Sequence, residues 1–148
     1  YGEGKNFIST ILRLACDRDI LKVVGDQFGV PTSARWLAHV ANVFIENSFA
    51  SGIYHAVPRG ETNWHQLACL TVQTALDNGQ LLQLDPNAII AIPSSEYPLP
   101  APRPMNSRLS SKKLEVELKR LGLVSKLPHW NTPWDEQVLS YVKHISEE

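Results

Sequence analysis

Four prolines within seven residues, from Pro98 to Pro104, set the strongest limit on what this chain can fold into. Proline lacks a backbone donor and fixes φ, so the run cannot belong to a helix. Prolines favour the stiff, extended polyproline II conformation, so the run is not a flexible spacer either. Its one charged side chain is Arg103. The run therefore predicts a stiff segment that holds a guanidinium in a fixed place.

Outside the proline run, the sequence predicts amphipathic helices separated by short strands. Apolar residues at helical spacing predict five helices, at residues 6–17, 34–46, 64–78, about 111–121 and 133–145. Short apolar runs predict strands at 21–24, 52–57 and 88–92. No strand–helix junction carries a GxGxxG or GxxxxGK[ST] loop. The expected class is α/β, without a complete dinucleotide-binding domain.

Several residues support these helix boundaries. Thr62 or Asn63 is expected to cap the third helix and Thr132 the last, because their side chains accept a bond from a free backbone N–H. Gly79 and Gly122 are expected just after the third and fourth helices. Glycine adopts the left-handed conformation that often ends a helix.

Composition excludes several function classes. Fourteen basic and fifteen acidic residues give a net charge of −1, which argues against broad binding to nucleic acid or an anionic membrane. No apolar run reaches the roughly 18 residues that span a bilayer. Cys16 and Cys69 both fall in helical patterns and read as buried free thiols of a cytoplasmic protein. No cluster of metal ligands is visible, so no metal site is expected.

Three residues stand out as candidate anion or polar contacts, each with an ordinary alternative. Asn6 begins a helix, where free N–H groups can bind an anion, or it is only the helix cap. Arg103 can pair two donors with a phosphate, or form a surface ion pair. Gln27 lies in a loop shaped by glycine and proline, where functional groups are common but so is turn chemistry. Arg108 and Lys112 are expected to be solvated. The residues alone do not indicate a reaction.

Three stretches, at 1–38, 52–68 and 96–115, resemble the C-terminal half of the dTDP-4-dehydrorhamnose reductases. They carry NFxxTxLRL, VxDQxGxPT, GxYHxxxxGxTxW and YPxPAxRPxxSxLxxxKL, in order and with natural spacing. Each motif is weak alone, but the combination is specific. The resemblance implies an extended short-chain dehydrogenase that reduces the C4 ketone of dTDP-4-dehydro-6-deoxy-L-mannose with NADPH or NADH. It also implies a Tyr that acts as general acid and a Lys four residues later that lowers the pKa of this Tyr.

The chain departs from the full family pattern because it has neither the glycine fingerprint nor the catalytic YxxxK. Tyr1 and Lys5 mimic YxxxK, but the following NFISTILRL fixes the register and excludes them. The chain starts at Tyr1, and its only methionine is Met105. We therefore expect a piece of a longer protein, with the catalytic residues and most of the cofactor site upstream and no activity of its own.

The resemblance implies that this chain carries the substrate-binding residues of the family. Asn6 and Arg103 match residues that touch the sugar-nucleotide diphosphate, so the proline run would present Arg103 opposite the start of the first helix. Gln27 matches a loop facing the nucleoside and is a candidate base contact, and Tyr1 matches a position near the substrate. Arg35 and His39 occupy positions that are often acidic in the family, so Mg²⁺ binding is doubtful.

The sequence leaves the oligomeric state and the biochemical role of the protein open. A homodimer is a possible assembly. A non-catalytic reductase-like regulatory subunit and a standalone sugar-nucleotide binding module are the alternatives to an enzyme. Strands separated from a larger sheet would leave unpaired edges and apolar faces, so the isolated chain is expected to self-associate or to be marginally stable.

Overall fold

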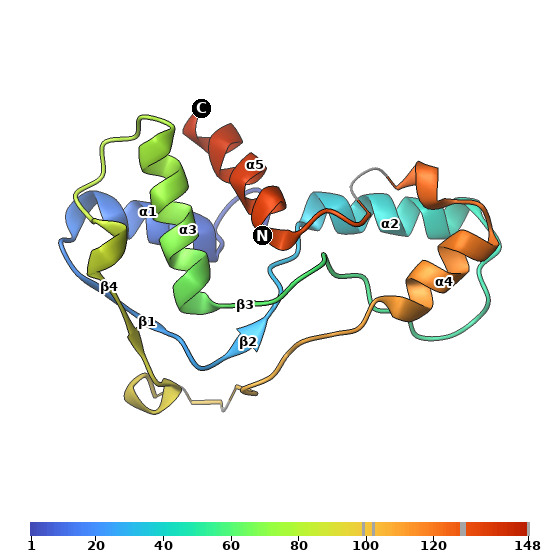
Figure 1. Ribbon diagram of the computed structural model, residues 1–148, viewed down its shortest axis with the longest axis horizontal. Helices are drawn as coiled ribbons and strands as arrows, with labels where there is room; N and C mark the ends of the chain where they lie inside the picture. Colours follow the sequence, from blue (N-terminus) through green and yellow to red (C-terminus); the bar gives the residue numbers. More distant parts are fainter. Residues whose placement is uncertain (99, 102, 128–129, 148) are drawn as a thin grey trace.

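The computed structural model describes residues 1–98, 100–101, 103–127 and 130–147. In that part of the chain the elements are α1 (Phe7–Asp17), β1 (Leu21–Val24), β2 (Phe28–Gly29), α2 (Ala34–Glu46), β3 (Thr62–Asn63), α3 (Trp64–Asp77), β4 (Ile89–Ile92), α4 (Lys112–Arg120) and α5 (Trp134–Ser146). Short 3₁₀ turns lie at Pro86–Ala88, Ser94–Glu96 and Val124–Lys126. Five helices and a few short strands confirm the predicted α/β class. The molecule is elongated, with two lobes side by side (Figure 1).

The first lobe is built around α3. One side of α3 packs on α1 and on a two-stranded parallel sheet of β1 and β4, and another side packs on α5. In the sheet, Leu21 lies opposite Ile89 and Val24 opposite Ile92. The buried cluster between α1, α3 and the sheet contains Ile11, Ala15, Val23, Ala68, Val72, Leu84 and Ile89. The buried cluster that α3 shares with α5 contains Ile8, Leu67, Ala75, Val138 and Val142. Because α3 is buried on both sides, it is the central element of this lobe.

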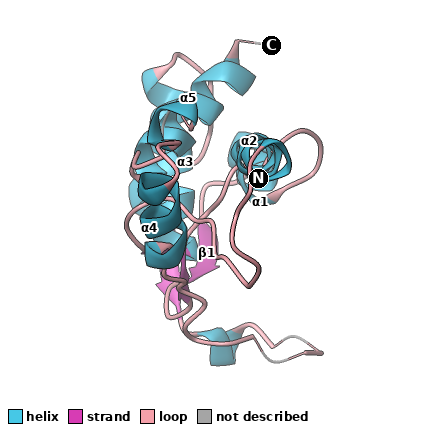
Figure 2. Cartoon of the chain, turned by 90° about the vertical axis from the view of Figure 1, so that its right-hand side faces the viewer, coloured by secondary structure: helices cyan, strands magenta, loops and turns pink. Residues whose placement is uncertain are grey.

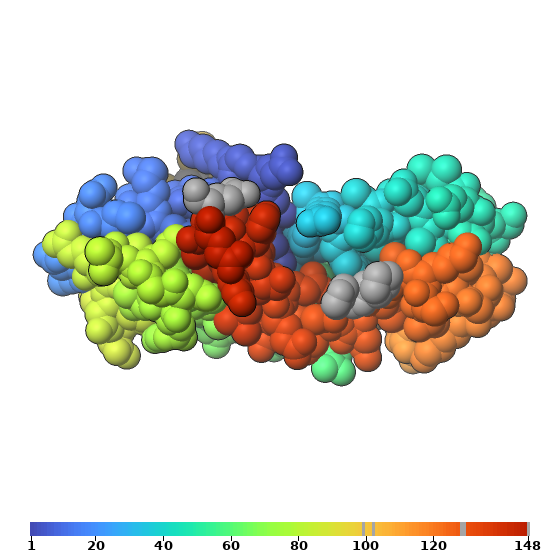
Figure 3. Space-filling view, turned by 90° about the horizontal axis from the view of Figure 1, so that it is seen from above, coloured from blue at the N-terminus to red at the C-terminus, as the bar shows by residue number. Residues whose placement is uncertain are grey.

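The second lobe consists of α2, α4 and the loops that join them to the rest, and it extends to one end of the molecule (Figure 3). Its buried residues are Trp36, Val40, Val43, Leu114, Leu118, Leu123 and Leu127. Phe44 and Phe49 stack with ring centroids 3.8 Å apart, and Tyr54 packs edge-on against both. This lobe has one apolar layer between two helices and no strand among its described residues.

A narrow backbone ladder lies between the lobes, with β2 in its middle. Phe28 pairs antiparallel with Asn63 of β3 and bridges Asn106 in parallel. The N–H of Phe28 donates to the carbonyl of Met105 (2.9 Å), and the N–H of Ser107 donates to the carbonyl of Phe28 (2.8 Å). Three segments far apart in the sequence therefore lie side by side. Figure 2 shows that the turn at Ser94–Glu96 lies at the end of the molecule away from the C-terminus.

The expected helix ends are mostly confirmed. Asn63 caps α3, because its Oδ1 accepts a bond from the third N–H of the helix (2.8 Å). Gly79 and Gly122 follow α3 and α4 with φ of 82° and 67°, the left-handed conformation that glycine adopts readily. Thr132 as the cap of the last helix is wrong, since Pro133 occupies the cap position and no side chain there makes a capping bond.

The strand predicted at 52–57 is also wrong. Ile53 is 79% exposed, and its carbonyl accepts a bond from Lys113 Nζ (3.1 Å) rather than from another strand. No backbone N–H of 52–57 is bonded to a described residue. A strand needs a partner for its backbone groups, and the described part of the chain supplies none here. The free state of Cys16 and Cys69 is confirmed, but their expected burial is not: Cys16 is exposed and Cys69 is half-buried.

Candidate functional site

The loop at 25–33 and the segment at 103–108, which hold two of the sequence motifs, meet at the ladder. The loop follows β1 and is fixed at its start, where the N–H of Gly25 donates to the carbonyl of Ile92 (2.9 Å). Asp26 then accepts bonds from the N–H of Ser94 (3.0 and 2.9 Å) and from its hydroxyl (3.0 Å). Backbone bonds at β2 therefore hold the two segments together, and the Asp26 carboxylate fixes the loop to the turn at Ser94–Glu96.

Gln27 and Arg103 lie in this region with free polar groups. Gln27 is half-buried and Arg103 is exposed, and neither side chain makes a hydrogen bond or ion pair with the rest of the described chain. The surface ion pair that was the alternative for Arg103 is thus not formed with any described residue. Leu99 and Pro102 lie outside the described residues, so the predicted stiff run is not described as a whole.

Asn6 is a helix cap with a fully engaged side chain. Its Oδ1 accepts a bond from the N–H of Ser9 (3.2 Å), and the Ser9 hydroxyl accepts from the N–H of Asn6 (2.9 Å), which is a capping box. Its Nδ2 donates to the carbonyl of Gly2 (2.7 Å) and to the hydroxyl of Tyr141 on α5 (2.9 Å). The capping role is confirmed, and contact with a diphosphate stays a prediction.

Tyr1 packs into the core of the first lobe. Its ring lies 4.9 Å from that of Tyr141, and its hydroxyl is buried without a partner among the described residues. Burial raises the pKa of Tyr1 well above its usual value, and the neighbouring Tyr141 raises it further. Lys5 is exposed. Excluding Tyr1 and Lys5 as the acid pair stays a prediction from the register of the sequence motif.

Arg108 is a residue that the sequence reasoning missed. It was expected to be solvated, but its Nη1 donates to Glu61 Oε2 (2.6 Å) and its Nε to Asn106 Oδ1 (2.9 Å). Its guanidinium also lies over the ring of Phe28, 5.8 Å from the centroid. One signal was available: Asn106 and Arg108 are two apart in an extended segment, so their side chains share a face.

The structure does not bring Asn6 and Arg103 into contact. In the described chain, no hydrogen bond or ion pair joins residues 1–6 to residues 103–108. The connection is indirect and runs through the loop that enters α2. The terminal amino group of Tyr1 donates to the carbonyl of Thr32 (2.9 Å), and the N–H of Ala34 donates to the carbonyl of Tyr1 (2.7 Å).

The described residues do not form a dinucleotide site. A glycine-rich turn that binds a pyrophosphate leads from a strand into a helix. Here the turn after β1 contains Gly25 alone and leads into β2. Within the described ranges, no three His, Cys, Asp or Glu side chains gather as a metal site. No helix there is long and apolar enough to cross a membrane.

An open cavity of about 630 Å³ lies elsewhere, between α1 and α5. Ser9, Arg13 and Cys16 line it from α1, and Tyr141 and His144 from α5. Gln27 and Arg103 are not among its lining residues. The cavity is therefore separate from the site at the ladder.

The comparison with known proteins settles the family. Residues 1–143 match the family described as RmlD substrate binding domain. The chain belongs to this family. It is 42% identical over 133 residues to a dTDP-4-dehydrorhamnose reductase of Escherichia coli. This alignment covers 87% of this chain and 42% of the Escherichia coli protein. It is 41% identical over 135 residues to the reductase of Burkholderia thailandensis, covering 86% of this chain and 44% of the relative.

Solved structures of this family share the fold. A dTDP-4-dehydrorhamnose reductase from Clostridium acetobutylicum superimposes with a TM-score of 0.80 at 28% identity, covering 98% of this chain and 45% of that one. The Bacillus anthracis reductase, solved in complex with NADP, superimposes with a TM-score of 0.74 at 26% identity. The match covers 96% of this chain and 44% of the Bacillus anthracis chain. The chain thus spans less than half the length of the relatives that it matches.

Proposed function

We propose that this chain is the substrate-binding part of a dTDP-4-dehydrorhamnose reductase. The whole protein would reduce the C4 ketone of dTDP-4-dehydro-6-deoxy-L-mannose to dTDP-L-rhamnose with NADPH or NADH. The observation that carries the proposal is the family match over residues 1–143, together with the 42% identity to a reductase of that name. Two free cysteines agree with a reducing, cytoplasmic location.

Within the proposal, this chain binds and orients the substrate, and the hydride donor and proton donor come from the rest of the protein. NADP is bound in the Bacillus anthracis relative, but the turn after β1 does not fit a dinucleotide here. The cofactor would therefore be held mainly by residues outside this chain. Orienting the sugar against a cofactor bound elsewhere accelerates the reaction by holding the reacting atoms in place.

Arg103 is the proposed anchor for the substrate diphosphate. Its guanidinium is exposed and has no partner in the described chain, and it is two residues from Met105, whose backbone is bonded to β2. A guanidinium can pair two donors with phosphate oxygens. Asn6, at the positive end of α1, is the proposed second side of the clamp. Tyr1 and Gln27 are the remaining candidate substrate contacts.

The test is NADPH oxidation by the complete protein with the keto sugar as substrate, comparing wild type with Arg103→Ala. Losing hydrogen bonds to a charged group costs about 1.5–3 kcal/mol, so kcat/KM is expected to fall about 10- to 100-fold, chiefly through KM. Lys112→Ala is the control, since Lys112 is also an exposed cation and should leave turnover unchanged. No turnover by the wild type would reject the enzyme and favour the regulatory subunit.

A further inference from the structure

Phe28 and Arg108 form an exposed cation–π pair on the ladder between the two lobes. Phe28 is in the middle strand, so its backbone is fixed on both sides by Asn63 and by the segment at 105–107. Its side chain nevertheless remains 37% exposed. The guanidinium carbon of Arg108 lies 5.8 Å from the centre of its ring. An apolar ring held by backbone bonds thus has a guanidinium above it at cation–π distance.

The plane of Arg108 is held along two of its edges. Asn106 Oδ1 accepts bonds from Nε of Arg108 (2.9 Å) and from its backbone N–H (3.1 Å). Glu61 Oε2 accepts from Nη1 (2.6 Å), and Nη2 has no bond to a described residue. The Arg108 side chain is still 44% exposed. The guanidinium is therefore oriented in advance, with donors and one face still available.

Stability alone does not explain this arrangement. Both partners of the ion pair are about half exposed, at 44% and 56%, and pairs of this kind contribute about 0–1 kcal/mol. A fixed, accessible guanidinium plane is a surface on which a nucleobase stacks, since bases stack on arginine planes as they do on aromatic rings. Phe28 lies on one side of this guanidinium, at cation–π distance.

We propose that Arg108, held over Phe28 by Glu61 and Asn106, is the platform on which the pyrimidine base of the nucleotide-sugar substrate stacks. This rests on the proposed function, because it assumes a dTDP-sugar ligand. It also competes with the prediction that Gln27 contacts the base. Successive side chains of an extended segment point to opposite faces, so Gln27 is expected on the face of the ladder away from Phe28. A base on Arg108 would lie out of its reach.

The experiment is calorimetric titration of the complete protein with dTDP and, separately, with inorganic pyrophosphate. Arg108→Lys keeps the charge but removes the plane. It should weaken dTDP binding about tenfold or more, because stacking one base contributes about that factor, and leave pyrophosphate binding unchanged. Phe28→Leu should weaken dTDP binding in the same selective way. Lys112→Ala should bind both probes like the wild type, Gln27→Ala tests the competing base contact, and thermal melts confirm that each variant is folded.

Three results would overturn the stack: equal dTDP affinity in wild type and Arg108→Lys, a parallel loss of dTDP and pyrophosphate binding, or a selective loss in Gln27→Ala instead. The first makes Arg108 a surface ion pair, and the second makes it a phosphate contact. Turnover of the keto sugar by the wild type separates this inference from the proposed function. A protein that binds dTDP but does not turn over rejects the reaction, while the Arg108→Lys comparison still decides the stack.

Discussion

The two lobes of this molecule are stabilised differently. In the first lobe, α3 is buried between the β1–β4 sheet with α1 on one side and α5 on the other. The second lobe has a single apolar layer between α2 and α4. A lobe with one layer buries less apolar surface per residue. Its other contacts therefore matter more to its stability.

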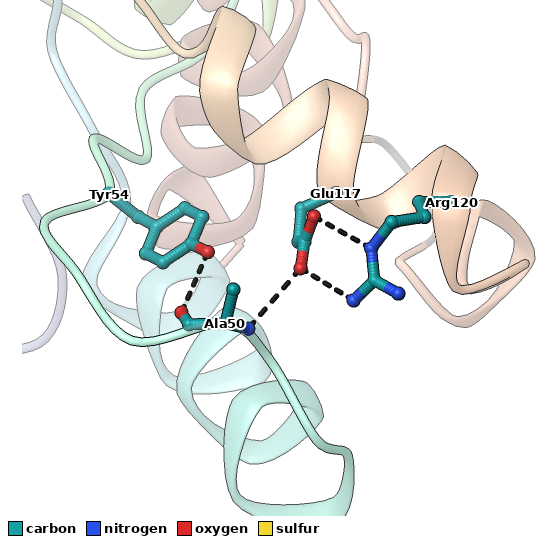
Figure 4. A network of polar contacts seen from close by, with 4 residues as sticks. All are labelled: Ala50, Tyr54, Glu117 and Arg120. Atoms are coloured by element: carbon teal, nitrogen blue, oxygen red, sulfur yellow. Dashed lines mark hydrogen bonds and ion pairs between the residues drawn. The ribbon is translucent and has the colours of Figure 1, made fainter.

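A polar network compensates in part for this thin core (Figure 4). Glu117 on α4 is largely buried and accepts bonds from Arg120 Nε (3.0 Å) and Nη2 (2.7 Å) and from the N–H of Ala50 (3.2 Å). The carbonyl of Ala50 accepts from the Tyr54 hydroxyl (2.8 Å). One carboxylate thus connects α4 to the loop that follows α2. The first lobe has no buried charged side chain among its described residues.

The largest effect should come from matched core truncations. Leu118→Ala in α4 and Leu67→Ala in α3 each remove a buried leucine, which costs about 2–5 kcal/mol. Hydrogen exchange of the complete protein should show that Leu118→Ala accelerates amides of α2 and α4 and leaves α3 protected. Leu67→Ala should accelerate amides of the whole first lobe. Equal loss of protection in both lobes for both variants would mean that they form one cooperative unit.

A smaller, pH-dependent effect should come from the network. The hydrogen bond from Arg120 lowers the pKa of Glu117, so the folded state favours its carboxylate. This contribution is present above the unfolded pKa of about 4.3 and is lost as pH falls through the lower folded value. Glu117→Gln should lower the melting temperature near neutral pH, with a difference from wild type that shrinks below about pH 4.

Glu115→Gln is the matched control for this network. Glu115 pairs with Lys119 on the exposed side of the same helix, where an ion pair contributes about 0–1 kcal/mol. The melting temperature of the Glu115→Gln variant should stay close to that of the wild type at every pH. If both variants behave alike, Glu117 is an ordinary surface carboxylate and the network does not stabilise the second lobe.

The smallest effect is expected at Tyr1. Its buried hydroxyl has no partner in the described chain, so Tyr1→Phe should leave the free energy of unfolding unchanged or raise it by up to about 1 kcal/mol. Tyr141→Phe should instead lower it by about 1–2 kcal/mol, because that hydroxyl bonds to both Asn6 and Gly2. Urea unfolding of the complete protein measures both. Loss of substrate binding in Tyr1→Phe would show that its hydroxyl reaches the ligand.

The contrast between local and long-range contacts decides how far the sequence could predict this structure. The helices and their ends at Asn63, Gly79 and Gly122 follow from side chains within a few residues of each other. Residues 52–57 have the composition of a strand, but a strand also needs a neighbour, which the sequence pattern does not reveal. The two-residue strands β2 and β3 were missed because pairing with distant segments creates them.

The candidate site follows the same rule. The capping role of Asn6 is local, and it was predicted together with its alternative. The platform at Arg108 depends on Glu61, Asn106 and Phe28, which come from three separate segments. The spacing of Asn106 and Arg108 is a local signal for their own contact, but no local pattern indicates that Glu61 and Phe28 meet them.

The most direct test of where this chain binds its ligand is a crystal structure of the complete protein with dTDP. We expect the diphosphate within hydrogen-bonding distance of Arg103 and the base against the ladder that contains β2. Density for dTDP in the cavity between α1 and α5, or at a place remote from residues 25–33 and 103–108, would contradict the proposed substrate site.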